Sequence, residues 1–101
     1  MDVAWALPAV GDLRENMAFY GAKEMGLGDR FEQEVEDAIG RIVRYPRAWF
    51  DLGGGFRRCQ MHSFLYGVYY QVQGERIVIM AVLDLRRSAE TWQRRLRELG
   101  I

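Results

Sequence analysis

The chain has 101 residues, half of them hydrophobic, which suits a single domain, residues 1–101, with one modest core. It lacks both the roughly 18 consecutive apolar residues of a membrane span and a basic, apolar signal segment, so we expect a cytoplasmic protein with no membrane partner. One cysteine and one histidine exclude an internal disulfide and a zinc cluster, and we expect neither a metal nor another cofactor.

The formal charge is zero, but the charges are divided unevenly along the chain. Residues 1–55 carry ten acidic and six basic side chains, a net charge of −4. Residues 56–101 carry four acidic side chains and eight arginines, a net charge of +4. Because a local excess of one sign attracts partners of the other sign, the second half is the candidate binding region.

The first predicted helix covers residues 12–25. Asp12 followed by Glu15 is a capping-box pattern, which favours a helix start at that point. Residues 3–7, just before Pro8, are apolar and predict an additional edge strand.

A second helix is predicted over residues 30–44. Two glycines within residues 25–28 favour a turn, and Asp29 can cap the helix that follows. From Phe31 the apolar residues recur at helical spacing, with acidic residues on the other faces, until Pro46 ends the pattern. The two helices form a hairpin, and we interpret the acidic side of the second helix as a solvated face.

Three strands follow a run of glycines. The glycines at 53–55 predict a flexible connector, and without a following Gly-Lys-Ser/Thr pattern they do not indicate a nucleotide loop. Residues 56–62, 66–73 and 76–83 read as strands of an antiparallel meander, with a tight turn at Gly74. The last strand is almost wholly apolar, so both of its faces must be covered. It is therefore either central in the sheet, or a partner closes one of its faces.

The chain ends with an arginine-rich helix. Ser88 offers an N-cap, and Trp92, Leu96 and Leu99 fall on one side of the helix. The order of elements is typical of an α+β fold in which an N-terminal helical hairpin packs on an antiparallel sheet and a short C-terminal helix follows. The meander and final helix together span residues 56–99.

Several segments in this order resemble one protein family. They are Leu-Gly-Asp-Arg-Phe at 27–31, Pro46, Arg57-Arg58, Phe-Leu-Tyr-Gly-Val-Tyr-Tyr at 64–70, Ala-Val-Leu-Asp-Leu-Arg-Arg at 81–87, and Trp92. Together, over about residues 12–95, they resemble the RelE/ParE superfamily, the toxins of type II toxin–antitoxin and plasmid-stabilisation modules. The resemblance implies a twisted sheet of three or four antiparallel strands, growth inhibition by the toxin, and a cognate antitoxin that wraps around it.

The resemblance leaves the activity open, because the family contains gyrase inhibitors of the ParE type, ribosome-dependent mRNA endonucleases of the RelE type, and members without a known target. For a nuclease, the resemblance implies Arg58 and Arg87 as phosphate-binding cations, with His62 as the one imidazole available. Gln60 and Gly67 stand where further basic residues are expected, and Trp92 and Gln93 occupy the region of the aromatic acid/base group. Metal-free cleavage needs an acid and a base as well as cations, so we favour a toxin that binds its target without catalysis.

The candidate binding residues for antitoxin or target are Arg57, Arg86, Arg87, Trp92, Arg94 and Arg95. The arginines suit three partners: nucleic acid or the ribosome, an acidic segment of an antitoxin, or the acidic second helix of the same chain. The neutral total charge favours a gyrase-directed binder over a ribosome-directed nuclease, and a member that has lost its toxicity is the third alternative. A second copy of the chain, giving a homodimer, is an alternative cover for the apolar strand at 76–83.

Overall fold

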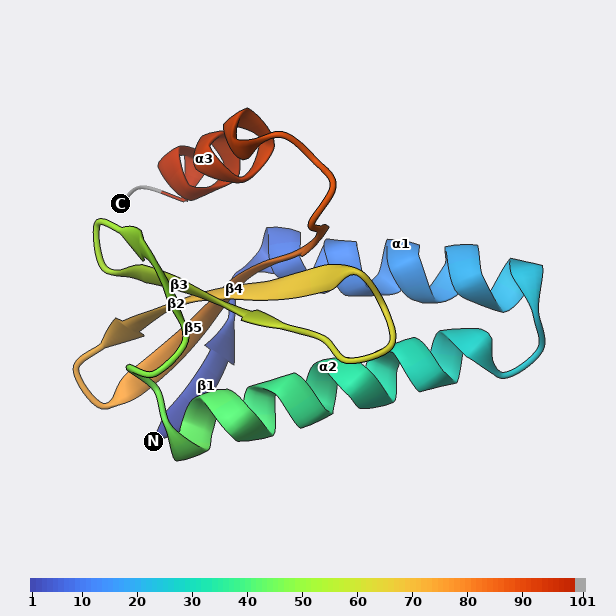
Figure 1. The fold of residues 1–101 in the computed structure, drawn as a ribbon, viewed down its shortest axis with the longest axis horizontal. Coiled ribbons are helices and arrows are strands. Elements are labelled where there is room, and N and C mark those ends of the chain that lie inside the picture. The colour runs from blue at the N-terminus through green and yellow to red at the C-terminus, as the bar shows by residue number, and fades with distance from the viewer. Residues whose placement is uncertain (100–101) are drawn as a thin grey trace.

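The computed structural model describes residues 1–99. Its elements, in chain order, are β1 (Asp2–Trp5), α1 (Leu7–Lys23), α2 (Leu27–Arg44), β2 (Phe50–Gly53), β3 (Phe56–Gln60), β4 (Tyr66–Gln73), β5 (Arg76–Asp84) and α3 (Ala89–Glu98). Helices α1 and α2 form a hairpin against one face of the sheet, and α3 packs on the other face (Figure 1). The predicted α+β fold is therefore confirmed.

The sheet has the strand order β1-β5-β4-β3-β2. The predicted meander is confirmed as β3, β4 and β5, whose pairings are antiparallel. Two details differ from the expectation: the sheet has five strands rather than three or four, and β1 runs parallel to β5. The parallel pairing needs a long crossover connection, and the chain supplies one because α1, α2, β2, β3 and β4 all lie between β1 and β5.

The N-terminal helix begins earlier than predicted. It starts at Leu7 with Pro8 in its first turn, where the fixed φ of proline favours a helix start. Asp12 lies inside the helix and is only 7% exposed, so its predicted role in a capping box is wrong. The strand predicted just before this helix is present as β1, at the edge of the sheet.

The two helices approach closely at their connection. Gly26, with φ of 84°, precedes α2, and Asp29 lies in the first turn of α2 instead of capping it. A Cβ atom on Gly28 would lie 2.4 Å from the carbonyl oxygen of Met17 in α1. The glycine therefore allows the backbones of α1 and α2 to pack against each other, which a larger residue would prevent.

The glycine run forms the turn of a β-hairpin. Gly53, Gly54 and Gly55 have φ of 86°, 63° and 85°, and they join β2 to β3. The carboxylate of Asp51 accepts a 2.8 Å hydrogen bond from the Gly53 N–H. The predicted flexible connector is thus wrong, because left-handed conformations that glycine adopts easily build a tight turn here.

Strand β5 lies between β1 and β4 and is covered on both faces, as its apolar sequence predicts. Tyr69 pairs with Ala81 and Tyr70 with Ile79, so Met80 is the extra residue of a β-bulge. The bulge shifts the alternation of side chains along the strand. The helical hairpin covers Ile77, Ile79 and Val82, whereas Met80, Ala81 and Leu83 belong to the face that carries α3.

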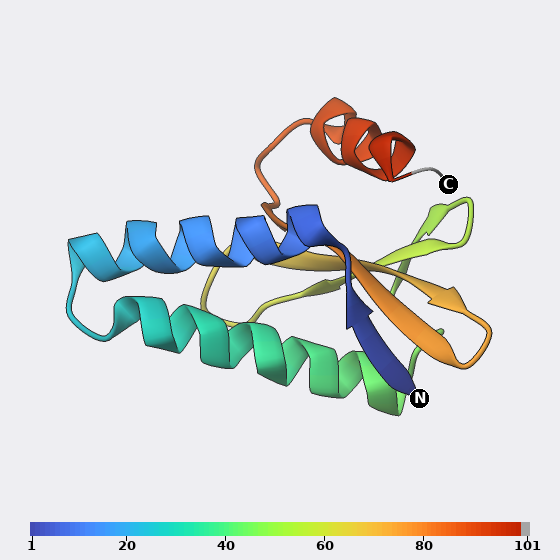
Figure 2. The ribbon, with the colours of Figure 1, turned by 180° about the vertical axis from the view of Figure 1, so that it is seen from behind.

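Most of the core lies between the helical hairpin and the sheet (Figure 2). Its buried side chains come from both helices and from β3, β4 and β5, and include Phe31, Val35, Ile42, Val68, Tyr70 and Ile79. The opposite face has a smaller cluster in which Leu96 and Trp92 of α3 pack towards Phe56 and Met80, as the predicted apolar side of that helix requires. Ser88 precedes α3 as predicted, but its hydroxyl lies 3.3 Å from the Thr91 hydroxyl and makes no cap to the backbone.

Candidate binding surface

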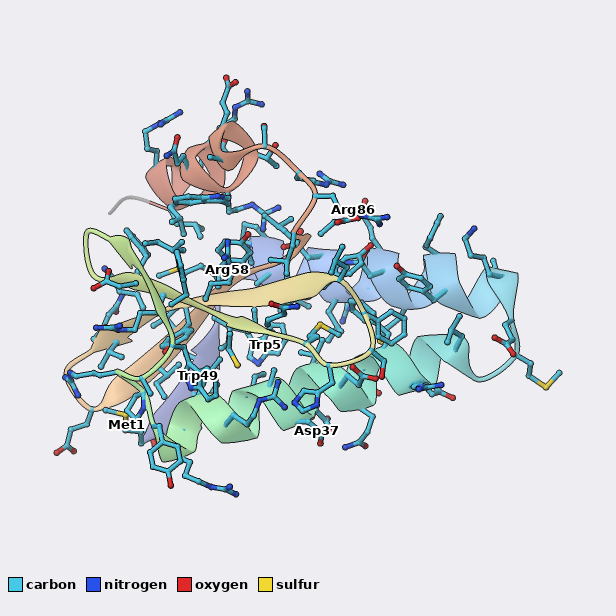
Figure 3. The ribbon with its side chains drawn as sticks, in the orientation of Figure 1. Met1, Trp5, Asp37, Trp49, Arg58 and Arg86 are labelled. Carbon is cyan, nitrogen blue, oxygen red and sulfur yellow. The ribbon has the colours of Figure 1, made fainter. Side chains whose placement is uncertain are left out.

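Arg58 lies on the face of the sheet towards α3 (Figure 3). Its guanidinium is 4.8 Å from the centre of the Phe50 ring and 5.9 Å from that of Tyr69, and the Tyr69 ring is 6.1 Å from the ring of Trp92. Gly67 makes room for this arrangement, because a Cβ there would lie 2.8 Å from the Arg58 side chain. We call Phe50, Arg58, Tyr69 and Trp92 the arginine–aromatic row, since cation–π and ring contacts connect them in this order.

Arg57 points to the opposite face, because successive side chains of a strand alternate. One of its guanidinium nitrogens donates a 2.9 Å hydrogen bond to the Trp49 carbonyl, and another lies 3.7 Å from the Asp51 carboxylate. The structure thus separates the two neighbouring arginines. Arg57 supports the segment leading into β2, and Arg58 joins the arginine–aromatic row.

Arg86 is bound to Asp84 of its own chain. The guanidinium donates to both carboxylate oxygens, at 2.9 Å and 2.6 Å, and the Arg86 backbone N–H donates to the same carboxylate at 2.8 Å. These hydrogen bonds hold the pKa of Asp84 below its usual value. Figure 3 shows Arg86 on the segment between β5 and α3, apart from Arg58.

Arg87 lines a different groove, between α1 and the start of β4. Its neighbours in this groove include Glu15, Asn16, Phe19 and Tyr66. Within residues 1–99 its side chain makes no hydrogen bond or ion pair. Arg87 is therefore available for a partner, in a groove whose lining does not include Arg58.

Arg95 connects α3 with α1 and β5 through hydrogen bonds. Its two terminal nitrogens donate to the Asp12 carboxylate at 2.6 Å and 2.8 Å, and the same carboxylate accepts a 2.9 Å hydrogen bond from the Val82 N–H. Asn16 donates to the Val82 carbonyl at 3.4 Å. Because β1 pairs with β5 only as far as Ile79, these side chains satisfy the edge of β5 that β1 leaves open. Arg95 thus has a structural partner that the sequence pattern did not reveal.

Arg94, the other predicted arginine of α3, lies closer to solvent than Arg95. Arg94 forms an exposed ion pair with Glu90, one turn earlier, at 3.3 Å. Among residues 1–99 the ion pairs of α3 reach Glu90 and Asp12, and neither residue belongs to α2. Pairing of the arginine-rich helix with the acidic second helix, one of the three alternatives, is therefore not observed in the described part of the chain.

His62 is exposed and lies just after β3, on the side of α2. It lines a groove of about 460 Å³ together with Glu36, Asp37, Arg41 and Arg44. The structure thus places Arg58, Arg87 and His62 in three different surroundings rather than around one reacting centre.

Three tyrosines of β4, Tyr66, Tyr69 and Tyr70, have a raised pKa. Burial raises the pKa of Tyr69, against the opposing effect of Arg58, and burial also raises the pKa of Tyr66 and brings that of Tyr70 to about 12. The hydroxyl of Tyr70 donates a 2.6 Å hydrogen bond to the Pro46 carbonyl. At neutral pH these groups are phenols that can donate a hydrogen bond and are poor proton acceptors.

Sequence reasoning missed Phe50, Tyr69 and Asp12. The alternation of β4 could have placed Tyr69 and Gly67 on one face, but nothing in the local sequence connects them with Arg58 or Phe50. Asp12 and Asn16 are four residues apart and share a helix face, yet their partner Val82 is seventy residues from Asp12. Such contacts follow from the tertiary structure alone.

Two further properties bear on function. Within residues 1–99, no three His, Cys, Asp or Glu side chains gather in a way that could hold a metal ion. The helices of that range are also too short or too polar to cross a membrane.

Comparison with solved structures identifies the class of fold. A structure of the chromosomal ParDE toxin–antitoxin system from P. aeruginosa matches with a TM-score of 0.62 and 15% identity, covering 85% of this chain and 97% of the other. A crystal structure of the isolated E. coli RelE toxin matches with a TM-score of 0.63 and 16% identity, covering 97% of both chains. The chain therefore has the fold of the RelE/ParE superfamily toxins.

Sequence comparison identifies the family within that class. The model of the ParE toxin of the type II toxin–antitoxin system parDE matches residues 3–89. The chain belongs to this family and is a type II toxin–antitoxin toxin. A search of curated proteins gives no match.

Proposed function

We propose that this toxin binds and inhibits its target without cleaving RNA, that the target is DNA gyrase, and that a cognate antitoxin neutralises it. The family match to ParE toxins supports the choice of gyrase. The observation that supports a mechanism without chemistry is the separation of Arg58, Arg87 and His62, which line different parts of the surface. Metal-free phosphodiester cleavage requires an acid, a base and cations around one phosphate.

The arginine–aromatic row is the part of the surface that we assign to target binding. An arginine stacked on aromatic rings is held in place, so less conformational freedom is lost when it binds a carboxylate or phosphate. Trp92 and Arg58 also belong to the residue types that dominate binding energy in protein interfaces. We expect the toxin to act in the cytoplasm, where gyrase is found.

A supercoiling assay tests the proposal directly. The purified chain should inhibit gyrase, and Arg58→Ala should weaken inhibition by about tenfold or more, because it removes a central interface arginine. Arg30→Ala is the matched control: this arginine is exposed on α2, on the other side of the sheet, and its loss should leave inhibition unchanged. Equal inhibition by the original chain and by the Arg58→Ala variant would show that the arginine–aromatic row takes no part in target binding.

The second candidate function is a RelE-type ribosome-dependent mRNA endonuclease. The full-length structural match to the RelE toxin and the open position of Arg87 favour it. Primer extension on mRNA from cells that express the chain distinguishes the two functions. Codon-specific cuts that vanish in Arg87→Ala would overturn the binding mechanism, whereas intact mRNA with impaired supercoiling would support it.

A family member without toxicity is the third alternative, and expression experiments address it. The chain alone should stop growth, and co-expression with the product of the adjacent open reading frame should restore it. If cells grow normally while they contain verified soluble amounts of the chain, both toxin mechanisms are excluded. In that outcome the chain would act as a binding or structural domain.

A further inference from the structure

A small groove lies where the β2–β3 hairpin meets α3. It has a volume of about 220 Å³ and is lined by Leu52, Phe56, Trp92, Gln93, Leu96 and Arg97. Phe56 and Leu96 are buried and form its apolar floor, while Gln93 and Arg97 are exposed at its rim. The groove is smaller than the roughly 300–1,000 Å³ of typical small-molecule sites, and therefore suits an inserted side chain better than a cofactor.

The groove is preformed because α3 is fixed on the sheet. The bidentate contact of Arg95 with Asp12, only 20% and 7% exposed at the side chains, holds the wall of the groove in place. The ring of Trp92 rests near Tyr69 and completes the same wall. A partner would therefore not have to order this wall on binding, which removes part of the cost of association.

The charges around the groove favour an acidic partner. Arg97 lies at the rim and forms no ion pair within residues 1–99, unlike Arg94 and Arg95. Beyond Trp92 and Tyr69, the row continues to Arg58, which contacts rings rather than a carboxylate. Glu98, the next residue along the chain, is the acidic neighbour of Arg97. Guanidinium groups bind carboxylates in a bidentate manner, so this rim selects acidic side chains.

We propose that this groove binds a segment of the antitoxin in which one large apolar side chain is flanked by acidic residues. The apolar side chain enters between Leu52 and Leu96, and the neighbouring carboxylates bind Arg97 and Arg58. The proposal rests on the proposed neutralisation by an antitoxin. It also divides the arginines of α3 by role, because Arg97 contacts the partner and Arg95 positions the helix.

The test uses the chain together with the product of the adjacent open reading frame as the probe. Affinity is measured by calorimetry for the original chain, Arg97→Glu and Gln93→Glu, after circular dichroism has shown that each variant is folded. Arg97→Glu should weaken binding by about tenfold or more, because it replaces attraction by repulsion at the rim, and Gln93→Glu should weaken it by a smaller factor. Arg97→Lys, which keeps the charge but loses the bidentate geometry, should bind more tightly than Arg97→Glu and less tightly than the original chain.

Arg44→Glu is the matched control. It makes the same charge reversal at an exposed arginine of α2, in the groove of His62 on the other side of the sheet, and should change the affinity by less than about twofold. A complex that forms with equal affinity for Arg97→Glu and the original chain would overturn the groove proposal and leave neutralisation intact. If no complex forms and the neighbouring product does not restore growth, neutralisation by that product fails, and the groove proposal that rests on it fails as well.

A third outcome concerns self-association. If Arg97→Glu converts a dimer of the isolated chain into monomers without changing its affinity for the neighbouring product, the groove binds a second copy. Sedimentation of the isolated chain shows this directly. That result would overturn the assignment to an antitoxin.

Discussion

The two faces of the sheet differ in how they are covered. The face under α1 and α2 holds most of the core, including an aromatic cluster in which the Phe31 ring lies 5.5 Å, 5.0 Å and 5.1 Å from the rings of Tyr20, Phe64 and Tyr66. The face towards α3 has smaller clusters and leaves Phe50 62% exposed beside Arg58. The first face supplies most of the burial that stabilises the fold, and the second keeps aromatic and cationic groups available for a partner.

Phe31→Ala provides the largest test of this difference. The ring is fully buried, so its loss should lower the free energy of unfolding by about 3–5 kcal/mol, measured by urea denaturation. Phe50→Ala is the matched change on the other face and should cost less than about 1 kcal/mol, because most of that ring is already in water. Similar losses for both variants would contradict the assignment of stability to one face.

Gly28→Ala should also destabilise the face under the helical hairpin strongly. The added Cβ would collide with the carbonyl oxygen of Met17 and force α1 and α2 apart, at a cost of about 2–3 kcal/mol. Gly40→Ala, in the same helix with open space around its position, should instead stabilise the protein by up to about 1 kcal/mol. Thermal melting of both variants gives the sign of each effect, and two equal destabilisations would contradict the close approach at Gly28.

Asp12→Asn tests the link between the two faces. The substitution removes the negative charge to which Arg95 donates two hydrogen bonds. It should lower the free energy of unfolding by about 2–3 kcal/mol, since a partly buried cation loses its partner. Glu90→Gln, which weakens the exposed pair with Arg94, should cost at most about 0.5 kcal/mol. A double-mutant cycle with Arg95→Ala isolates the pair, and a coupling energy near zero would show that α3 is held by its apolar side chains alone.

A smaller effect than that of Asp12→Asn should come from Asp84, at the border of the α3 face. Its pKa is lower in the folded chain than in the unfolded chain because of Arg86, so its contribution to stability is complete above about pH 4 and is lost as the pH falls further. Asp84→Asn should therefore reduce stability by less than about 1 kcal/mol at neutral pH, since the Arg86 side chain is largely solvated. The difference between the variant and the original chain should shrink during acid titration, and a difference that grows below pH 4 would contradict the assigned pKa shift.

Much of the fold was predictable from local pattern. The apolar spacing of α2, the β-forming residues of β4 and the apolar run of β5 led to elements close to those observed. The start of α1 was predicted too late, because the Asp12 and Glu15 pattern outweighed Pro8. Strand β2 was missed because four residues ending in glycine are too short to show alternation.

The candidate binding surface was harder to predict from the sequence than the fold. Composition and charge drew attention to the arginines of the second half, but they treated those arginines as equivalent. The structure shows Arg57 bound to Trp49 and Asp51, Arg86 bound to Asp84, and Arg95 bound to Asp12. The catalytic roles of Arg58, Arg87 and His62 and the binding roles of the arginine set stay predictions that the proposed assays address.

The sequence by itself determined the helices, the meander and the family, because these depend on residue spacing and on short motifs along the chain. Only the tertiary structure decided which arginines are available and which are already bound. The physical reason is distance along the chain: the Arg95–Asp12 contact joins residues 83 positions apart, and neither local propensity nor charge composition carries information about such a pair.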